Sequence, residues 1–202
     1  HSLKYILLAG EKVNPKDLKE WYECFDERIQ LVNLYGPTET TLAKTFYRIK
    51  REDIEKNMIP IGKPIDGCKI AVISNDNNLC ANGEIGEIII RTPYRTLGYY
   101  KDEKANKEKF VKNPFGNSDE DIVYKTGDIG RMLPDGNFEI IGRKDRQIKI
   151  RGYRVEPEDC ESCIINYPEI KDCAVVYKRK KGLEEVSTCI KCGIPSDYPS
   201  RR

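Results

Sequence analysis

Residues 33–41 read Asn-Leu-Tyr-Gly-Pro-Thr-Glu-Thr-Thr, and the organisation of the chain is best understood outward from this stretch. The apolar run Ile29–Leu34 predicts a strand, which the turn residues Gly36-Pro37 break. The loop that follows presents a hydroxyl and a carboxylate, Thr38 and Glu39. This pair suits a nucleotide phosphate with its Mg²⁺, because Mg²⁺ takes one or two carboxylates and leaves other positions to phosphate and water. Taken alone, the stretch is explained at least as well by an ordinary turn.

Upstream of this stretch, the pattern predicts a strand, a helix and then the strand just described. Tyr5–Leu8 is a short apolar run that ends in a turn, which is typical of a buried strand. From Pro15, apolar residues recur at the three- and four-residue spacing of an amphipathic helix, at Leu18, Trp21, Tyr22 and Phe25. The strand–helix–strand order predicts parallel α/β packing in residues 1–57, at the end of a larger α/β core.

Downstream, residues 58–144 change to short β-rich runs between turn residues. The runs are Lys69–Ser74, Glu84–Arg91 and Asn137–Ile141. Gly and Asn accept positive φ cheaply, so the intervening Asn- and Gly-rich segments read as tight turns. This region is predicted to be a small antiparallel sheet or a distorted barrel.

A third region begins near Asp145 and reads as part of a small α+β domain over residues 145–188. A helix is predicted from Pro157 to about Tyr167, followed by a strand over Lys171–Tyr177. Residues 189–202 form a tail with a Cys-x-x-Cys pattern, which could open another module. Because the chain starts directly in a hydrophobic strand, we expect it to be a piece of a longer protein.

Composition narrows the function classes. The chain has 202 residues, 39% of them apolar, and its charges nearly cancel to +2. That balance gives no reason to expect a nucleic acid or an anionic membrane as a partner, and no apolar stretch is long enough to span a bilayer. No export signal is recognised, so the eight cysteines favour a reducing, cytoplasmic setting over a disulfide framework.

Two further polar islands accompany the first one. Tyr124–Asp128 contains Thr-Gly-Asp, which sets one carboxylate beside a flexible Gly and suits a pair of ribose hydroxyls. Gly142–Gly152 opens with Gly-Arg-Lys-Asp and supplies positive charge near the predicted domain joint. Each island alone is explained by an Asx turn or a solvated run of charge.

The three islands together, in this order, closely resemble the core motifs of the AMP-forming adenylate superfamily, which contains acyl-CoA synthetases, luciferases and adenylation domains of nonribosomal peptide synthetases. Gly83–Ile88 and Leu97–Tyr100 fill the place of a fourth motif. The resemblance extends to about residue 188. The form of Asn33–Glu39 is typical of amino-acid adenylation domains.

The resemblance implies a nucleotide site on the first island. Tyr35 would stack on adenine, with Asn33 near its exocyclic amine and Gly36 in the same binding loop. Thr38 would hydrogen-bond the α-phosphate, and Glu39 would hold Mg²⁺. The implied reaction is attack of a carboxylate on the α-phosphate of ATP, with release of pyrophosphate.

The resemblance also assigns roles to the later islands. Asp128 would take the ribose hydroxyls with the help of Arg143. Asp145 would be the hinge of the small domain. Lys149 and Gly152 would lie on the acceptor side, near the phosphopantetheine tunnel, although alternating Lys and Arg on a strand can equally be a solvated face.

By the same resemblance the acyl pocket is lined by small or aliphatic residues, namely Leu7, Ala9, Leu34, Leu42 and Ala43. Such a lining favours an uncharged side chain on the substrate. Leu7 and Leu34 could equally be core residues.

Two departures from the family pattern bear on activity. The Gly-, Ser- and Thr-rich phosphate loop is absent, and no Pro-x-Gly-Lys segment follows Val186. We therefore expect this stretch alone to be inactive in adenylation.

The cysteine pattern leaves three readings open. Cys189 and Cys192, followed by Gly, look like half of a zinc knuckle. Cys160 and Cys163 could complete a four-thiolate set, but they lie in the predicted helix, where a free Cys is commonly a small buried hydrophobe. The readings are a four-Cys site, a half-site completed by another domain, and no metal.

The function expected from the sequence is therefore part of an amino-acid adenylation domain, which uses ATP and Mg²⁺ and serves a phosphopantetheinyl carrier protein. The enzyme alternative is an acyl- or aryl-CoA ligase. The alternative from another class is a non-catalytic remnant whose tail is a zinc-stabilised docking module.

Overall fold

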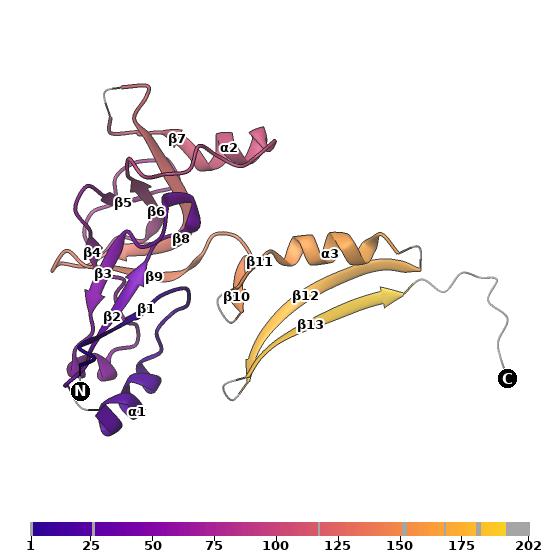
Figure 1. Cartoon of the computed structure of the whole chain (residues 1–202). Coiled ribbons are helices and arrows are strands. Elements are labelled where there is room, and N and C mark those ends of the chain that lie inside the picture. The colour runs from indigo at the N-terminus through magenta and orange to yellow at the C-terminus, as the bar shows by residue number, and fades with distance from the viewer. Residues whose placement is uncertain are drawn as a thin grey trace, which may run out of the picture. The chain divides into compact units, whose positions relative to one another are not determined.

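The structure is a computed structural model that describes residues 2–25, 27–116, 118–150, 153–167, 169–180 and 183–192 (Figure 1). The backbone alone is described for 178–180 and 183–192. The chain divides into two compact units, residues 1–144 and residues 145–202. None of the described helices has the length and apolar character needed to cross a membrane.

The first sheet of the first unit carries the predicted strand–helix–strand segment. Its four strands lie in the order β1 (Tyr5–Leu8), β2 (Gln30–Tyr35), β3 (Thr45–Arg48) and β4 (Lys63–Pro64). β1 and β2 are parallel and are joined through α1 (Pro15–Phe25), while β3 and β4 are antiparallel to their neighbours. The predicted parallel α/β packing is thus confirmed at this edge of the sheet.

The core of this sheet lies on one face, under α1 and the short helix η2 (Arg51–Glu55). Leu18 and Tyr22 of α1 pack with Leu31 of β2, and Ile6 and Leu8 of β1 join them. The prediction that the strand Tyr5–Leu8 is buried was wrong for the face of β1 that points away from α1. There Tyr5 is 51% and Leu7 is 63% exposed, because β1 is an edge strand and only its alternate residues meet the helix.

The second sheet is antiparallel and is built around one long strand, β8. The strands are β5 (Lys69–Ile73), β6 (Gly86–Arg91), β7 (Phe110–Lys112), β8 (Ile122–Met132) and β9 (Phe138–Arg143). They run in the order β5-β6-β8-β7, and β9 also pairs with β8. The β-rich region is therefore a five-stranded sheet.

One helix of this region was missed by the sequence analysis. α2 (Glu103–Lys109) is capped by Asp102, whose Oδ1 accepts a hydrogen bond from the Ala105 amide at 2.9 Å. An Asp at this position satisfies one of the unpaired amides of a helix start. The helix carries no buried residue, so its short polar sequence lacks the apolar periodicity that reveals a helix.

The two sheets of the first unit share a core. Gly62 pairs with Phe138 of β9, and the Ile61 amide donates to the Phe138 carbonyl at 2.8 Å. A buried cluster of Ile61, Val72, Ile88, Ile90 and Phe138 packs against Tyr35 at the end of β2. This packing brings the end of the first sheet onto β8 and β9.

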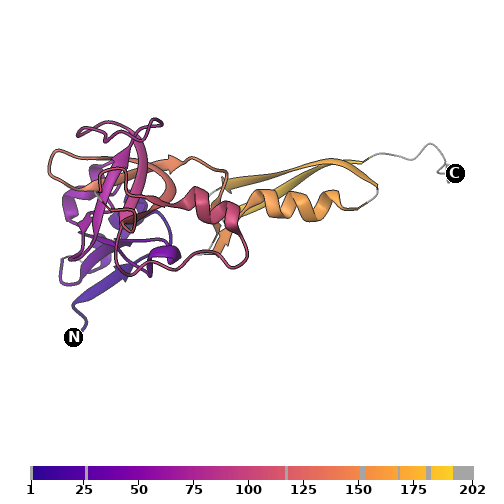
Figure 2. The ribbon, with the colours of Figure 1, turned by 90° about the horizontal axis from the view of Figure 1, so that it is seen from above.

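The second unit consists of two hairpins and a helix, namely β10 (Ile148–Ile150), β11 (Tyr153–Val155), α3 (Pro157–Ile165), β12 (Ile170–Lys180) and β13 (Leu183–Cys192). α3 lies along the β12–β13 hairpin (Figures 1 and 2). The helix starts at Pro157 as predicted and ends two residues before Tyr167.

The expected boundary of the Cys-x-x-Cys tail was wrong. Cys189 and Cys192 belong to β13 and pair with Ala174 and Ile170 of β12. The ladder between the two strands continues to Ile170 and so includes these cysteines in the hairpin. The backbone there is extended, whereas a zinc knuckle needs a turn between its two thiolates.

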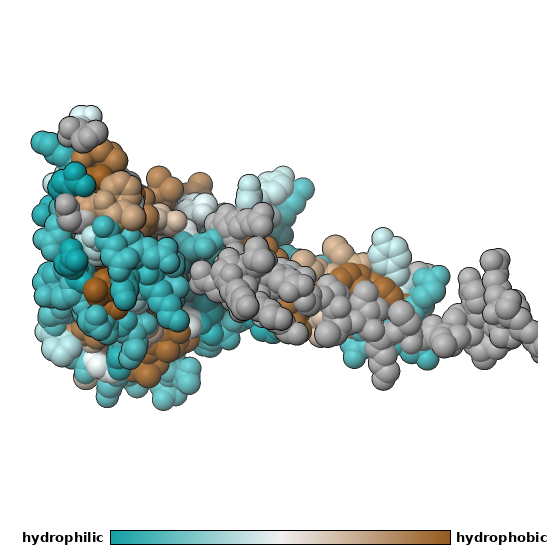
Figure 3. Space-filling model, turned by 90° about the horizontal axis from the view of Figure 1, so that it is seen from below, coloured by the Kyte–Doolittle hydropathy of each residue, from teal (hydrophilic) through white to brown (hydrophobic). Residues whose placement is uncertain are grey.

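The surface of the first unit mixes hydrophilic and hydrophobic side chains. On the face in Figure 3, brown hydrophobic groups reach the surface in separate places among teal hydrophilic ones. The large apolar side chains most exposed in this unit include Leu42, Leu97 and Tyr100.

Candidate functional site

Residues from all three sequence islands meet at one carboxylate, Asp128. The Tyr35 hydroxyl donates to Asp128 Oδ2 at 2.5 Å, and Arg143 Nη1 donates to Asp128 Oδ1 at 2.7 Å. Tyr35 ends β2, while Asp128 and Arg143 are directly paired across β8 and β9. The shared core of the two sheets thus unites motifs that are 93 and 15 residues apart in the chain.

The environment fixes the direction of the Tyr35 hydrogen bond. Removal of the phenol from water, followed by the negative charge of Asp128, raises the pKa of Tyr35 well above its usual range. The hydroxyl therefore stays protonated at neutral pH and acts as a donor to the carboxylate. Asp128 is 9% exposed, so its charge is shielded from bulk water and held by these two donors.

The Thr-Gly-Asp sequence explains how Asp128 reaches this position. Gly127 has a φ of +75°, which a side chain would disfavour, and it lies where β8 is irregularly paired. The Thr126 hydroxyl donates to the Ile88 carbonyl at 2.7 Å and accepts from the Asp128 amide at 3.0 Å. Both residues before Asp128 thus shape the backbone that presents its carboxylate.

Glu87 is a site-supporting residue to which the sequence analysis gave no role. It is 7% exposed, and its Oε1 accepts from the Gly127 amide at 3.1 Å. Its Oε2 lies 3.4 Å from Lys144 Nζ and 3.7 Å from Lys125 Nζ. Glu87 therefore ties β6 to the turn before Asp128. Only the Gly-Glu-Ile-Gly-Glu sequence of residues 83–87 indicated a function for this position.

Glu39 forms a second buried carboxylate. It lies on the short helix η1 (Thr38–Thr40) and is 4% exposed, whereas Thr38 beside it is exposed. The Tyr99 hydroxyl donates to Glu39 Oε1 at 2.6 Å and lies 3.2 Å from the Tyr124 hydroxyl. Tyr99 and Tyr124 were missed as partners, since nothing in the sequence shows which tyrosine meets Glu39.

Gly36 allows the loop after β2 to fold back on itself. A Cβ on Gly36 would lie 2.0 Å from the Leu42 carbonyl oxygen and 2.8 Å from the Lys44 amide nitrogen. That same amide donates to the Tyr35 carbonyl at 2.7 Å. The loop that carries Glu39 therefore requires glycine here for space.

Asn33 is buried and bonded to a neighbouring loop. It is 4% exposed, and its Nδ2 donates to the Pro60 carbonyl at 2.8 Å. Asn33 and Tyr35 share a face of β2, because side chains alternate along a strand. An adenine amine would have to donate to Asn33 Oδ1, because the amide nitrogen of Asn33 is itself a donor.

Three of the five predicted pocket residues are exposed. Leu7 pairs with Val32, so Leu7 and Leu34 project from the same face of the first sheet. Leu7 is 63% and Leu42 is 78% exposed. Ala9 is also exposed, and Ala43 is half-buried. The alternative that Leu7 is a core residue is wrong.

The residues assigned to the hinge and acceptor side lie in the second unit. Asp145 is exposed, and its Oδ1 accepts from the Gln147 amide at 3.3 Å. Lys149 is an exposed residue of β10, paired with Arg154. Gly152 lies outside the described residues.

The cysteines of the second unit give no metal centre in the part that is described. Cys160 is half-buried and Cys163 is exposed on α3. No group of three or more His, Cys, Asp or Glu suited to a metal occurs among the described residues. The side chains of Cys189 and Cys192 are outside that set.

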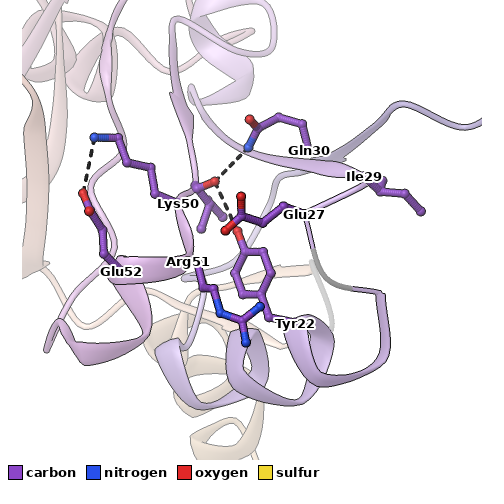
Figure 4. A pocket seen from close by; sticks show the side chains of 8 residues that line it. Tyr22, Glu27, Ile29, Gln30, Lys50, Arg51 and Glu52 are labelled. Carbon is purple, nitrogen blue, oxygen red and sulfur yellow. Dashed lines mark hydrogen bonds and ion pairs between the residues drawn. The ribbon is translucent and has the colours of Figure 1, made fainter.

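A surface cavity of about 330 Å³ lies away from Asp128 and Glu39, between α1 and η2. Figure 4 shows polar and charged side chains around it, and its hydrogen bonds are made within the protein. Tyr22 and Gln30 both donate to the Ile49 carbonyl, and Lys50 pairs with Glu52. Neither Asp128 nor Glu39 lines this cavity, so it is separate from the two carboxylates described above.

Comparison with known proteins agrees with this geometry. Residues 1–100 match the family described as AMP-binding enzyme. The chain is 40% identical over 178 residues to bacitracin synthase 1 of Bacillus licheniformis, covering 88% of this chain and 3% of that protein. It is 37% identical over 174 residues to gramicidin S synthase 1 of Brevibacillus brevis, covering 86% of this chain and 15% of that protein. The chain thus spans a small part of these relatives.

A solved structure extends the likeness to the fold. It is holo-PA1221, a nonribosomal peptide synthetase protein with adenylation and PCP domains, bound to a vinylsulfonamide inhibitor. The match has a TM-score of 0.87 and 28% identity, and it covers 95% of this chain and 33% of that chain. The chain therefore belongs to the AMP-binding enzymes of the AMP-forming adenylate superfamily and is of the type found in nonribosomal peptide synthetase adenylation domains.

Proposed function

We propose that the protein activates an amino acid with ATP, releases pyrophosphate and forms an acyl-adenylate, which it passes to a phosphopantetheinyl carrier protein. The observation that carries the proposal is the meeting of Tyr35, Asp128 and Arg143 at one carboxylate. Family membership supplies the class of reaction, and this cluster supplies a binding point for the nucleotide.

Asp128 and Arg143 would hold the ribose. A carboxylate offers about four lone-pair positions, and the donors on Tyr35 and Arg143 use two of them. The remaining positions suit the two hydroxyls of a ribose. The Tyr35 hydroxyl donates to Asp128, and this hydrogen bond fixes one edge of the ring. The raised pKa of Tyr35 keeps the phenol protonated, so that it can donate. The role of its face would be to stack on adenine.

Glu39 and Thr38 would hold Mg²⁺ and the α-phosphate. A carboxylate with an adjacent hydroxyl is the kind of oxygen donor set that Mg²⁺ takes in phosphate sites, so the residues fit this ion. When bound, Mg²⁺ would neutralise the negative charge on the phosphates. The exposed Thr38 hydroxyl would donate to the α-phosphate beside it.

The protein contributes mainly by positioning. The substrate carboxylate must approach the α-phosphorus in line with the leaving pyrophosphate, and no proton transfer is required at that step. Holding both reactants therefore lowers the barrier more than acid–base chemistry would. The rigid attachments of Asp128 and Glu39 serve this purpose, because a carboxylate that is already fixed loses little freedom on binding.

The substrate and acceptor follow from the family type. Leu7 and Leu34 are both apolar and share a face of the first sheet, which favours an amino acid with an uncharged side chain. The solved relative with adenylation and PCP domains supports a carrier protein over CoA. We place the activity in the cytoplasm.

A non-catalytic docking role with bound zinc is the second class of function, but the strand backbone at Cys189 and Cys192 gives it no support.

The proposal is tested by ATP–pyrophosphate exchange with the full-length protein, screened over the proteinogenic amino acids and several aryl acids. We expect exchange with one small uncharged amino acid. Adding a phosphopantetheinyl carrier or CoA to the same reaction then identifies the acceptor. A folded protein that exchanges with no acid on the panel would overturn the proposal.

A further inference from the structure

Tyr99 is held in place from three sides. Asn106 of α2 binds both main-chain groups of Tyr99, because its Oδ1 accepts from the Tyr99 amide at 2.6 Å and its Nδ2 donates to the Tyr99 carbonyl at 2.9 Å. The ring meets Phe110 edge-on, with 5.7 Å between ring centroids. The hydroxyl contacts Glu39 and Tyr124. A side chain fixed at backbone, ring and hydroxyl has little freedom left.

The loop that carries Tyr99 is also tied to the loop that carries Glu39. The Thr96 amide donates to the Glu39 carbonyl at 2.8 Å, and the Thr41 hydroxyl donates to the Tyr94 carbonyl at 2.7 Å. These two hydrogen bonds, in addition to the Tyr99–Glu39 hydrogen bond, hold the two loops together. The contact between the two side chains is therefore part of a built interface between the loops.

In the Tyr99–Glu39 pair, the tyrosine is the donor and the buried carboxylate is the acceptor. Glu39 is 4% exposed, so its carboxylate depends on protein donors more than on water. A phenol is a good donor to a carboxylate, and a hydrogen bond to a charged group is stronger than one between neutral groups. Tyr124, which is 1% exposed, lies 3.2 Å from the same hydroxyl and limits its rotation.

We propose that Tyr99 is a positioning residue that orients the Glu39 carboxylate for Mg²⁺. The inference rests on the proposed function, in which Glu39 holds the ion. Carboxylates that bind metals are commonly oriented by a further hydrogen-bonding partner, and loss of such a partner typically weakens metal affinity by about 10- to 100-fold. Tyr99 touches neither nucleotide nor substrate in this scheme and acts only through Glu39.

The test compares Tyr99→Phe with Tyr100→Phe in the full-length protein. Both remove one phenolic hydroxyl, but Tyr100 is 87% exposed and has no role in the site. ATP binding is measured by calorimetry over a range of Mg²⁺ concentrations, without the acid, so that no turnover occurs. We expect Y99F to need about tenfold more Mg²⁺ for the same ATP affinity, at the low end of the range for such partners.

Two further readouts separate positioning from damage to the fold. AMP binding without Mg²⁺ should be the same in Y99F and in the unchanged protein, because Asp128 and Tyr35 are intact. In a Glu39→Gln background, Y99F should add little to the loss of Mg²⁺ dependence, because coupled residues are not additive. Additive losses, or weaker AMP binding in Y99F, would overturn the inference.

The outcomes also distinguish this inference from the proposed function. If ATP binding by the unchanged protein does not depend on the Mg²⁺ concentration, the assignment of Glu39 is wrong, and the inference about Tyr99 is wrong too. If the unchanged protein responds to Mg²⁺ and Y99F responds equally, the inference alone is overturned. Should Y99F not fold, Tyr124→Phe removes the second contact of the same hydroxyl. It should shift the Mg²⁺ dependence in the same direction, and an unshifted response would contradict the inference.

Discussion

The two units differ in how far the residues with a proposed role are exposed. In the first unit, each carboxylate with a proposed role is buried and receives a tyrosine hydroxyl, Tyr35 for Asp128 and Tyr99 for Glu39. In the second unit, Asp145 and Lys149 are exposed. The difference indicates that the first unit holds its site residues through its own hydrogen bonds. The exposed residues of the second unit would act only by contacting another molecule or another part of the protein.

The elements of the two units are also joined differently. Buried clusters join the sheets and α1 of the first unit. In the second unit, Arg146 links α3 to β12 by binding both carboxylate oxygens of Glu161 and the Val175 carbonyl. The Val175 amide in turn donates to Glu161 Oε1 at 2.8 Å. Substitutions in the first unit should therefore have the larger effects.

The largest effect is expected for Gly36→Ala, which disturbs the loop between β2 and β3 in the first unit. The new methyl would meet the Leu42 carbonyl oxygen at 2.0 Å, so the backbone must move. We expect the free energy of unfolding to fall by about 3 kcal/mol, the upper end for overpacking, and pyrophosphate exchange to disappear. Gly142→Ala is the matched control, because nothing lies within 4 Å of its added Cβ. Thermal unfolding and exchange assays of both variants measure this. Equal behaviour of the two would contradict the prediction.

Next in size is Asp128→Ala, which removes the shared partner of Tyr35 and Arg143. ATP affinity should fall by about 100-fold, which corresponds to roughly 2.7 kcal/mol and to the loss of one or two hydrogen bonds to a charged group. Asp135→Ala changes an exposed Asp of the β8–β9 turn and should leave ATP affinity unchanged. Calorimetric titration with ATP distinguishes the two variants. An unchanged affinity in the Asp128 variant would remove the ribose assignment.

The sequence could predict part of the elements of each unit and the residue types of the site, for clear reasons. Apolar spacing revealed α1, and turn residues bounded β5, β6 and β9 of the second sheet, whereas β7 and the central strand β8 were not predicted. Motif order pointed to Asp128 and Glu39. The partners Tyr99, Tyr124 and Glu87 could not be predicted, because a hydrogen bond across 25 to 60 residues depends on how the sheets pack. α2 was missed because it has no apolar periodicity, and β13 because its cysteines suggested a metal motif.

A smaller effect is expected at acid pH in the second unit. The hydrogen bond from Arg146, and then that from the Val175 amide, lowers the pKa of Glu161 below its usual value of 4.5. A lowered folded-state pKa means that this contribution to stability is complete above about pH 4.5 and is lost as the pH falls through the lower folded value. The protection of the amides of residues 157–165 against exchange, corrected for the intrinsic pH dependence of exchange, should therefore fall below about pH 4.5.

Arg146→Gln tests that cause. It should speed up exchange in α3 already at pH 7 and flatten its acid dependence, while Arg146→Lys should be intermediate, because Lys keeps the charge without the two-pronged geometry. Exchange in α1 of the first unit is the internal reference, and it should not respond to either variant. An α3 with unaltered acid dependence in the Gln variant would show that another group controls its stability.

The smallest effect is expected for Lys149→Ala, and it tests whether the second unit acts through its surface. Lys149 is exposed on β10, so its loss should change the free energy of unfolding by less than about 0.5 kcal/mol. Pyrophosphate exchange should stay unchanged, since Asp128 and Glu39 are intact. Transfer to the carrier protein should slow by about two- to fivefold, the scale of one exposed ion pair. Lys171→Ala removes another exposed lysine of this unit and should leave transfer unchanged. If single-turnover transfer is equal in the two variants, Lys149 belongs to a solvated face, and any action of the second unit on the acceptor runs through other residues.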